Sequence, residues 1–266
     1  MDSEAALRLH YDSIAKDYVG VNQGVERVLA HLKLAPGASI LDIGCGTGNL
    51  TKRLALMGSP ARIVGVDISE GVLALAREQT RALQTVAYEF RQASATCLPF
   101  EDEEFDAVVS NMVFHLIPNQ EKSYSEALRV LKTSGKMVLQ MQGGGDIALE
   151  FMQVLQQAWE DVLPGEEPPE LTQKITVDTV ASHLKDLGVK DFDIKWSHRT
   201  RTLPAAAVPK VLAYGRLVLG FWRLGLDEAT ADRVETALTR RAQETASKQA
   251  GWTATGNVLL VNATKT

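Results

Sequence analysis

The sequence predicts an α/β fold: a doubly wound, mostly parallel sheet of seven strands with helices on both faces. Two observations lead to this prediction. From Ile40 to Gln142, nearly continuous apolar segments alternate with amphipathic ones, which is typical of parallel strands buried on both faces. The chain of 266 residues, 45% hydrophobic and 23% charged, is also long enough to bury a full core.

The first elements follow in a regular order. Residues 39–44 ("SILDIG") have the pattern of a short buried strand, and residues 49–58 that of an amphipathic helix ending in glycine. Residues 62–68 ("RIVGVDI") predict the second strand. Ser69 then caps a helix over 69–83, in which apolar residues recur at helical spacing.

Three further strands complete the regular part of the chain. Residues 86–93 predict a third strand with a weaker pattern, and residues 105–114 a fourth. A helix over 121–135, again ending in glycine, leads to a fifth strand over 136–142. In such a sheet the ligand crevice lies beyond the carboxyl ends of the strands.

After Gln142 the alternation becomes irregular. Helices are predicted over 146–163 and 176–188, and the last two strands over 192–203 and 256–265.

We interpret the whole chain, residues 1–266, as a single domain with two helical insertions. The insertions, at about 144–175 and 204–250, are expected to form a lid over the strand ends.

Composition excludes several classes of protein. The formal net charge of −5 gives no attraction to nucleic acid. Two cysteines, Cys45 and Cys97, are too few for a disulfide scaffold. No signal peptide is recognisable at the N-terminus, and the longest apolar segment, 208–226, contains three basic residues, so no stable membrane insertion is expected. We therefore expect a cytoplasmic protein; a homo-oligomer remains open.

The glycine run Gly44-Cys45-Gly46-Thr47-Gly48 directly follows the first strand and is preceded by Asp42. Glycine-rich turns at this place bind dinucleotides through a pyrophosphate, with a third glycine where this chain has Asn49. A carboxylate such as Asp42 would repel a pyrophosphate but attract a cation. S-adenosylmethionine, which carries an ammonium and a sulfonium and no phosphate, fits better. Asp67, at the end of the second strand, suits the hydroxyls of a ribose.

Four ordered motifs carry a resemblance to a known family. The segments "LDIGCGTG", "IVGVDIS", "LPFEDEEFDAVVSN" and "ALRVLKTSGKMVLQ" resemble class I S-adenosylmethionine-dependent methyltransferases, which have a Rossmann-like fold. Within that class the chain is most similar to the small-molecule branch with the ubiquinone/menaquinone and malonyl-carrier-protein methyltransferases. The resemblance covers about residues 8–142.

The resemblance assigns cofactor contacts to individual residues. It implies that the glycine loop binds the amino-acid part of S-adenosylmethionine, Asp67 the ribose and Ile68 the adenine. In place of the usual adenine-binding Asp this chain has Ser94, so adenine binding would depend on Ser94 and the backbone of Ala95. An N-terminal segment implied to fold over the cofactor adds two aromatic candidates. The expected cofactor-binding residues are Tyr11, Tyr18, Asp42, Gly44, Cys45, Gly46, Asp67, Ile68, Ser94, Ala95 and Asn111.

The fourth strand ends in "SNMVFHLIP", which places Asn111 and His115 where methyl group and acceptor should meet. An oxygen acceptor needs a base, and a histidine of ordinary pKa is suited to this role. His115 is therefore the candidate catalytic residue; the alternative is that it only fills the loop. No group of residues has metal-ligand spacing, so no metal is expected.

The acceptor is predicted to be a hydrophobic or aromatic small molecule. Phe114, Tyr214 and Trp222 are the candidate substrate-binding residues, although apolar residues around 212–222 more commonly belong to a core. The prediction is O-methylation. Two alternatives stay open, a C-methyltransferase and a protein that binds S-adenosylmethionine without transferring its methyl group.

Overall fold

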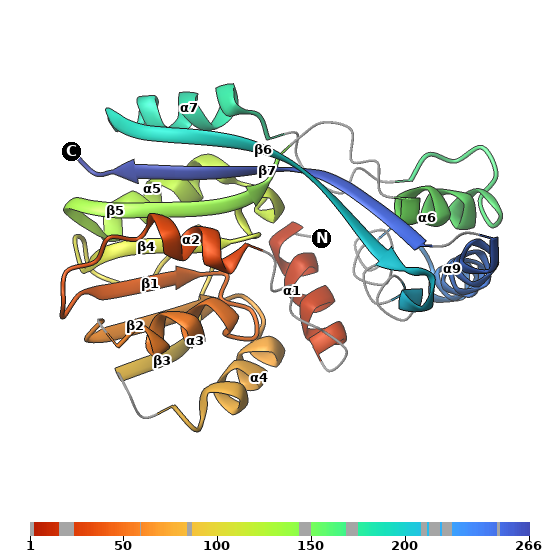
Figure 1. The fold of residues 1–266 in the computed structure, drawn as a ribbon, viewed down its shortest axis with the longest axis horizontal. Coiled ribbons are helices and arrows are strands. Elements are labelled where there is room, and N and C mark those ends of the chain that lie inside the picture. The colour runs from red at the N-terminus through yellow and green to blue at the C-terminus, as the bar shows by residue number, and fades with distance from the viewer. Residues whose placement is uncertain are drawn as a thin grey trace. The chain divides into compact units, whose positions relative to one another are not determined.

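A seven-stranded sheet organises the chain, with strand order β3-β2-β1-β4-β5-β7-β6 (Figure 1). The computed structural model describes residues 3–15, 24–58, 60–83, 87–143, 150–168, 175–208, 212, 219, 225–248 and 251–266. The strands are β1 (Ser39–Ile43), β2 (Arg62–Asp67), β3 (Ala87–Gln92), β4 (Phe105–Asn111), β5 (Leu131–Gln142), β6 (Asp191–Pro204) and β7 (Gly251–Thr264). Strands β1 to β5 pair in parallel, and β7 pairs with β5 antiparallel. The predicted doubly wound, mostly parallel sheet is confirmed.

Both faces of the sheet are buried, which explains the nearly continuous apolar strands. In β1, Leu41 and Ile43 belong to one core cluster, whereas Ile40 belongs to another on the opposite face. Helices α5 (Gln120–Val130) and α7 (Val177–Asp186) contribute to the first cluster. Helices α2 (Val25–His31) and α3 (Asn49–Leu56) contribute to the second.

Two further helices lie near the carboxyl ends of the first strands. Helix α4 (Glu70–Thr80) begins at Ser69, whose side chain accepts a hydrogen bond from the Val72 amide, as the predicted cap requires. Helix α1 (Ser3–Ile14) packs on α4, and in Figure 1 it lies at the end of the sheet toward which β1 points. Helix α1 therefore lies beside the turns that follow the parallel strands.

Several predicted boundaries were wrong; the last strand, for example, was predicted from residue 256 and begins at Gly251. The helix predicted to reach residue 135 ends at Val130, because Leu131 is extended and pairs with Phe105 as the start of β5. The fourth strand, predicted to reach Phe114, ends at Asn111, because Met112 has a φ of 63°. A short 3₁₀ turn, η2 (Phe114–Leu116), follows. His115 thus lies in a turn behind the strand.

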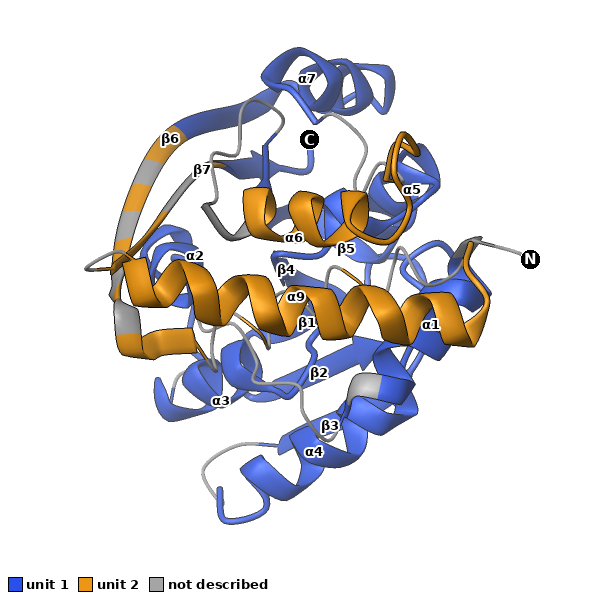
Figure 2. Cartoon of the chain, turned by 90° about the vertical axis from the view of Figure 1, so that its right-hand side faces the viewer, with its two compact units in different colours: residues 1–143, 174–196, 258–266 blue, residues 144–173, 197–257 orange. Residues whose placement is uncertain are grey.

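The chain divides into two compact units (Figure 2). Unit 1 comprises residues 1–143, 174–196 and 258–266, and unit 2 comprises residues 144–173 and 197–257. The chain passes from one to the other within β6 and within β7. Unit 2 includes the second predicted insertion and residues 144–173 of the first; their role as a lid remains a prediction.

Unit 2 has a core of its own. Helix α6 (Glu150–Glu160) packs on α9 (Glu228–Lys248), and the short turn η3 (Ala205–Ala207) also contacts α9. Leu219, one of the apolar residues left open as pocket or core, is 1% exposed in this cluster. On the surface, Asp161 accepts hydrogen bonds from Arg240 and Arg241. Within the residues described, no helix combines the length and the apolar character needed to cross a bilayer.

A partly buried ion pair anchors the loop that joins β3 to β4. Glu126 of α5 is 6% exposed and accepts hydrogen bonds from the Leu98 amide and from Arg129, which also binds the Leu98 and Phe100 carbonyl oxygens. Arg129 lowers the pKa of Glu126 to about 2. This loop carries Ser94 and Ala95, so α5 holds part of the candidate site in place.

We expect Glu126→Gln to lower the free energy of unfolding by about 2 kcal/mol at pH 7. The pKa of Glu126 is lower in the folded state than in the unfolded state, so its contribution is present above the ordinary value of 4.5 and is lost as the pH falls toward 2. Urea unfolding at several pH values measures this. Glu121→Gln, at an exposed position of the same helix, is the control. An equal loss at pH 7 and at pH 2 would contradict the ion-pair explanation.

Candidate cofactor and acceptor site

The glycine loop forms a tight turn behind β1. Gly44, Gly46 and Gly48 have φ angles of 67°, 54° and 79°, values that side-chain-bearing residues rarely adopt. A Cβ atom on Gly44 would also overlap the Val113 side chain. The Cys45 amide donates to the Val66 carbonyl oxygen at 2.9 Å, so the loop is tied to β2. Glycine is therefore required at these positions, because the backbone has positive φ angles. The turn places its backbone amide groups at the carboxyl ends of the strands.

Asp67 connects this loop to helix α4. One carboxylate oxygen accepts the Gly46 amide at 2.9 Å, and the other accepts the Ser69 amide at 3.0 Å. Burial raises the pKa of Asp67, and the backbone amides act in the opposite direction. A carboxylate oxygen has more than one acceptor position, so Asp67 retains capacity for the hydroxyls of a ribose. Ile68 follows it and is partly buried.

Asp42 lies below the loop and is 1% exposed. Its carboxyl group accepts a hydrogen bond of 2.7 Å from the Thr51 hydroxyl in the first turn of α3. Burial raises the pKa of Asp42 from 3.8 to about 7. Cys45 is also buried, and burial raises the pKa of its thiol well above the ordinary value, so this sulfur stays protonated.

The Ser94 loop forms a turn stabilised by its own side chains. The Ser94 hydroxyl accepts the Thr96 amide at 3.0 Å and shares a second hydrogen bond of 2.7 Å with the Thr96 hydroxyl. The Ala93 amide donates to the Asp67 carbonyl oxygen. The structure thus brings Ser94 and Ala95, both partly buried, close in space to the end of β2.

The residues expected where methyl group and acceptor meet lie at the end of β4 and in the turn behind it. The Asn111 side chain accepts a hydrogen bond of 2.7 Å from Gln140 of β5. His115 is 5% exposed, and its Nδ1 accepts the Gln142 amide at 3.4 Å. Burial lowers the pKa of His115 from 6.5 to about 4. Phe114 is fully buried against Tyr124, so in this structure its ring presents no surface to a substrate.

Three predicted residues lie outside the described part of the chain: Tyr18, Tyr214 and Trp222. Tyr11 is described; it is partly buried on α1, with its ring 5.3 Å from that of His10. Across the described residues, no group of three His, Cys, Asp or Glu side chains is placed to hold a metal ion.

Sequence reasoning missed Asp12, which belongs to α1 and bonds the start of α4. Asp12 Oδ1 accepts hydrogen bonds from the Ser69 hydroxyl at 2.6 Å and the Gly71 amide at 3.0 Å. A signal was present: glycine in the first turn of a helix is unfavourable unless something packs closely there. A Cβ atom on Gly71 would lie 2.9 Å from that of Ala15.

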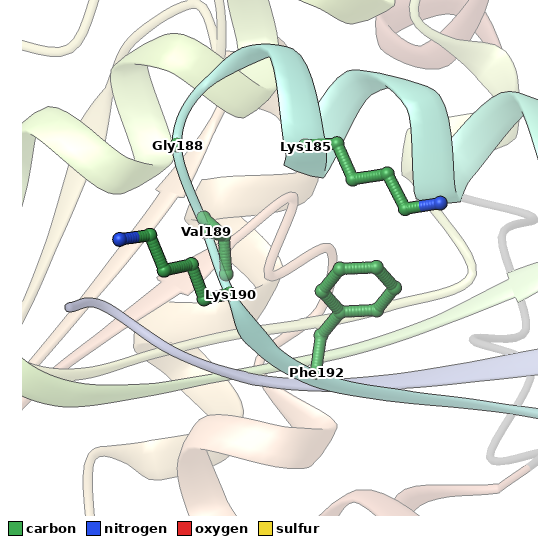
Figure 3. A pocket seen from close by; sticks show the side chains of 5 residues that line it. All are labelled: Lys185, Gly188, Val189, Lys190 and Phe192. Atoms are coloured by element: carbon green, nitrogen blue, oxygen red, sulfur yellow. The ribbon is translucent and has the colours of Figure 1, made fainter.

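A surface hollow of about 420 Å³ lies elsewhere, at the turn between α7 and β6 (Figure 3). Its lining residues are Lys185, Gly188, Val189, Lys190 and Phe192. The neighbouring Asp191 accepts a hydrogen bond from Thr264, which pairs with Lys136 toward the amino end of β5. The hollow is thus near the amino ends of the parallel strands, whereas the glycine loop lies at their carboxyl ends. Figure 3 shows its two lysine side chains pointing in opposite directions, which gives no common anion site.

The sequence of the chain matches a known family over residues 34–184, more than half of its length, and that family is described as a methyltransferase domain. The chain belongs to this methyltransferase family. The predicted family is therefore confirmed, and with it S-adenosylmethionine as the cofactor.

One curated relative is a demethylmenaquinone methyltransferase from Symbiobacterium thermophilum, 32% identical over 148 residues. These residues make up 52% of this chain and 59% of the relative, so the match spans little more than half of the relative's length.

Two solved structures share the fold of this methyltransferase over most of the chain. The YcgJ protein from Bacillus subtilis has a TM-score of 0.61 at 16% identity and covers 92% of this chain and 99% of its own. The [4+2]-cyclase SpnF has a TM-score of 0.61 at 17% identity and covers 97% of this chain and 94% of its own. At these identities the likeness concerns the fold alone.

The residues of the methyltransferase fit a cationic cofactor. Asp42 and Asp67 lie at the carboxyl ends of neighbouring strands, and Asp12 approaches from α1. Burial raises the pKa of both Asp42 and Asp67; the charge of Asp67 adds to this effect at Asp42, and the charge of Asp12 adds to it at Asp67. These carboxyl groups are therefore close enough to interact. A sulfonium and an ammonium would relieve this repulsion, whereas a pyrophosphate would increase it.

For the methyltransferase we expect Asp67→Asn to weaken S-adenosylhomocysteine binding by ~1–3 kcal/mol, the scale of hydrogen bonds to a charged group. Isothermal titration calorimetry measures this. Asp106→Asn is a matched control, since Asp106 also accepts a backbone amide, that of Ser39, but at the opposite edge of the sheet. Equal affinity of the Asp67→Asn variant and the unaltered protein would remove Asp67 from the site.

Binding of S-adenosylmethionine should release a proton at pH values below about 7, where Asp42 is partly protonated. The positive charge of the cofactor favours the ionised carboxylate, so affinity should rise as the pH approaches 7. Calorimetry in buffers of different ionisation enthalpy counts the protons. In Asp42→Asn this release should disappear; if it persists unchanged, another group is responsible.

Proposed function

We propose that the chain transfers a methyl group from S-adenosylmethionine to a ring carbon of an apolar, electron-rich aromatic small molecule. The observation that carries the choice of carbon over oxygen is the state of His115. Its pKa of about 4 makes it a weak base, and its Nδ1 already accepts the Gln142 amide. In the neutral ring the proton then resides on Nε2, which can donate but not accept.

The two acceptor types place different demands on the protein. A neutral hydroxyl must lose its proton as the new bond forms, and a base is most effective when its pKa is close to the working pH. An electron-rich ring carbon attacks first: the carbon–methyl bond forms, the methyl–sulfur bond breaks with its electron pair on sulfur, and the ring proton then passes to solvent water as the ring regains its aromaticity. The bound cofactor supplies the electrophilic methyl group. The protein supplies orientation and exclusion of water.

Within this proposal His115 acts as a hydrogen-bond donor to the acceptor, and Asn111 is its neighbour at the end of β4. The name of the curated relative gives demethylmenaquinone as its acceptor, which supports an apolar, ring-containing molecule here. The predicted alternative, O-methylation with His115 as base, is the outcome against which the proposal is tested.

The first test supplies S-adenosylmethionine labelled with ¹³C in the methyl group. Demethylated quinols and hydroxylated aromatics serve as acceptors, and S-adenosylhomocysteine release reports turnover. Because the fold also occurs in a cyclase, the assay must detect methyl transfer itself. The ¹³C chemical shift then distinguishes a methyl group on carbon, which we expect, from one on oxygen, which would contradict the proposal.

The second test separates the donor role of His115 from a basic one. Gln can donate a hydrogen bond but cannot act as a base, so His115→Gln should retain much more turnover than His115→Ala, which we expect to fall about tenfold. Cofactor affinity should change in neither variant. Loss of activity to the same extent in both would favour the general-base role.

A further inference from the structure

Helix α1 is bonded to both loops that carry predicted cofactor residues. Near its amino end, Glu4 accepts a hydrogen bond of 3.2 Å from Thr96, the partner of Ser94. Near its carboxyl end, Asp12 binds the first residues of α4, directly after Asp67. Figure 1 shows α1 beside α4. One helix therefore joins the loop after β2, expected to bind ribose, to the loop after β3, expected to bind adenine.

Asp12 completes a chain of hydrogen bonds that ends at Asp67. The Ser69 hydroxyl donates to Asp12 and accepts the Val72 amide, and the Ser69 amide donates to Asp67. Ser69 is fully buried, so its hydroxyl hydrogen needs a protein acceptor. Asp12 is that acceptor. It thereby orients the Ser69 hydroxyl for its capping role and holds the peptide group whose amide positions the Asp67 carboxylate.

Close packing adds to these hydrogen bonds. Because Gly71 has no side chain, Ala15 and Asp12 of α1 approach the first turn of α4 closely; a Cβ atom there would lie 3.3 Å from Asp12 Oδ1. Asp12 itself is exposed to solvent. An exposed carboxylate that accepts two hydrogen bonds from a neighbouring helix can hold α1 reversibly against α4.

We propose that Asp12 is a positioning residue for the cofactor: it docks α1 on α4 and, through Ser69, orients Asp67 for the ribose. This inference rests on the proposed function, in which S-adenosylmethionine is the methyl donor. Docking of α1 and cofactor binding are then linked equilibria, so each strengthens the other by the same factor. Loss of the Asp12 bonds weakens cofactor binding although Asp12 does not touch the cofactor.

The experiment measures S-adenosylhomocysteine affinity by calorimetry for the full chain and for Asp12→Ala and Asp12→Asn. We expect Asp12→Ala to lose about tenfold in affinity, equivalent to about 1.4 kcal/mol. Asp12→Asn should recover most of it, because an amide oxygen can still accept both hydrogen bonds. Asp227→Ala is the matched control: Asp227 accepts the Thr230 amide and hydroxyl at the start of α9, the same kind of cap in unit 2.

Hydrogen exchange gives a readout that a purely structural role would not change. In the unaltered chain, ligand should slow amide exchange in residues 3–15, and in Asp12→Ala this slowing should be lost. Asp227→Ala should lower the melting temperature while leaving both readouts as they are. Unaltered affinity and unaltered slowing in Asp12→Ala would overturn the inference alone. Failure of the unaltered chain to bind ligand would overturn the proposed function, and the inference with it.

Discussion

The site depends on Asp67, which holds three backbone segments together at the end of β2. Its carboxylate accepts amides from the glycine loop and from the start of α4, and its backbone carbonyl oxygen accepts the amide of Ala93 beyond β3. Parallel strands end at the same edge, so a single acid there can bond turns that are far apart in sequence. The glycine loop, the cap of α4 and the Ser94 loop therefore share one anchor.

Burial alters the chemistry of the groups around this anchor. Asp42 and His115 are both almost inaccessible, and burial favours the neutral form of each: the pKa of the acid rises to about 7 and that of the imidazole falls to about 4. The same physical cause thus makes Asp42 responsive to a cation near neutral pH and makes His115 a poor base. These two pKa shifts are consistent with a site that binds a positively charged methyl donor and acts on an acceptor that is nucleophilic without help from a base.

Cofactor binding and acceptor selection are expected in different parts of the chain. The family match reaches from residue 34 to 184 and so includes the first five strands, which carry most of the candidate cofactor residues. Unit 2 has a separate core around α6 and α9, with Trp159 buried and its indole donating to the Glu166 carbonyl oxygen. Surface loops and added elements vary more readily than a sheet buried on both faces. Acceptor selection is expected to reside there.

The amino-acid sequence by itself determined the sheet, the order of strands and helices up to Gln142, and the place of the glycine loop. These follow from local signals, since apolar runs, helical spacing and glycine act over a few residues. It also indicated Asp42 and Asp67 through their position at strand ends.

Only the tertiary structure decided which side chains meet and how deeply each is buried. The sequence extended the fourth strand through Phe114, whereas the φ of 63° at Met112 turns the chain and buries both Phe114 and His115. Gly71 indicated close packing at the start of α4, but Asp12, 57 residues from Ser69, became recognisable as the partner only when α1 was placed against α4. Burial and long-range hydrogen bonds arise from contacts between distant segments, and these set the pKa of His115 and the role of Asp12. No local pattern contains that information.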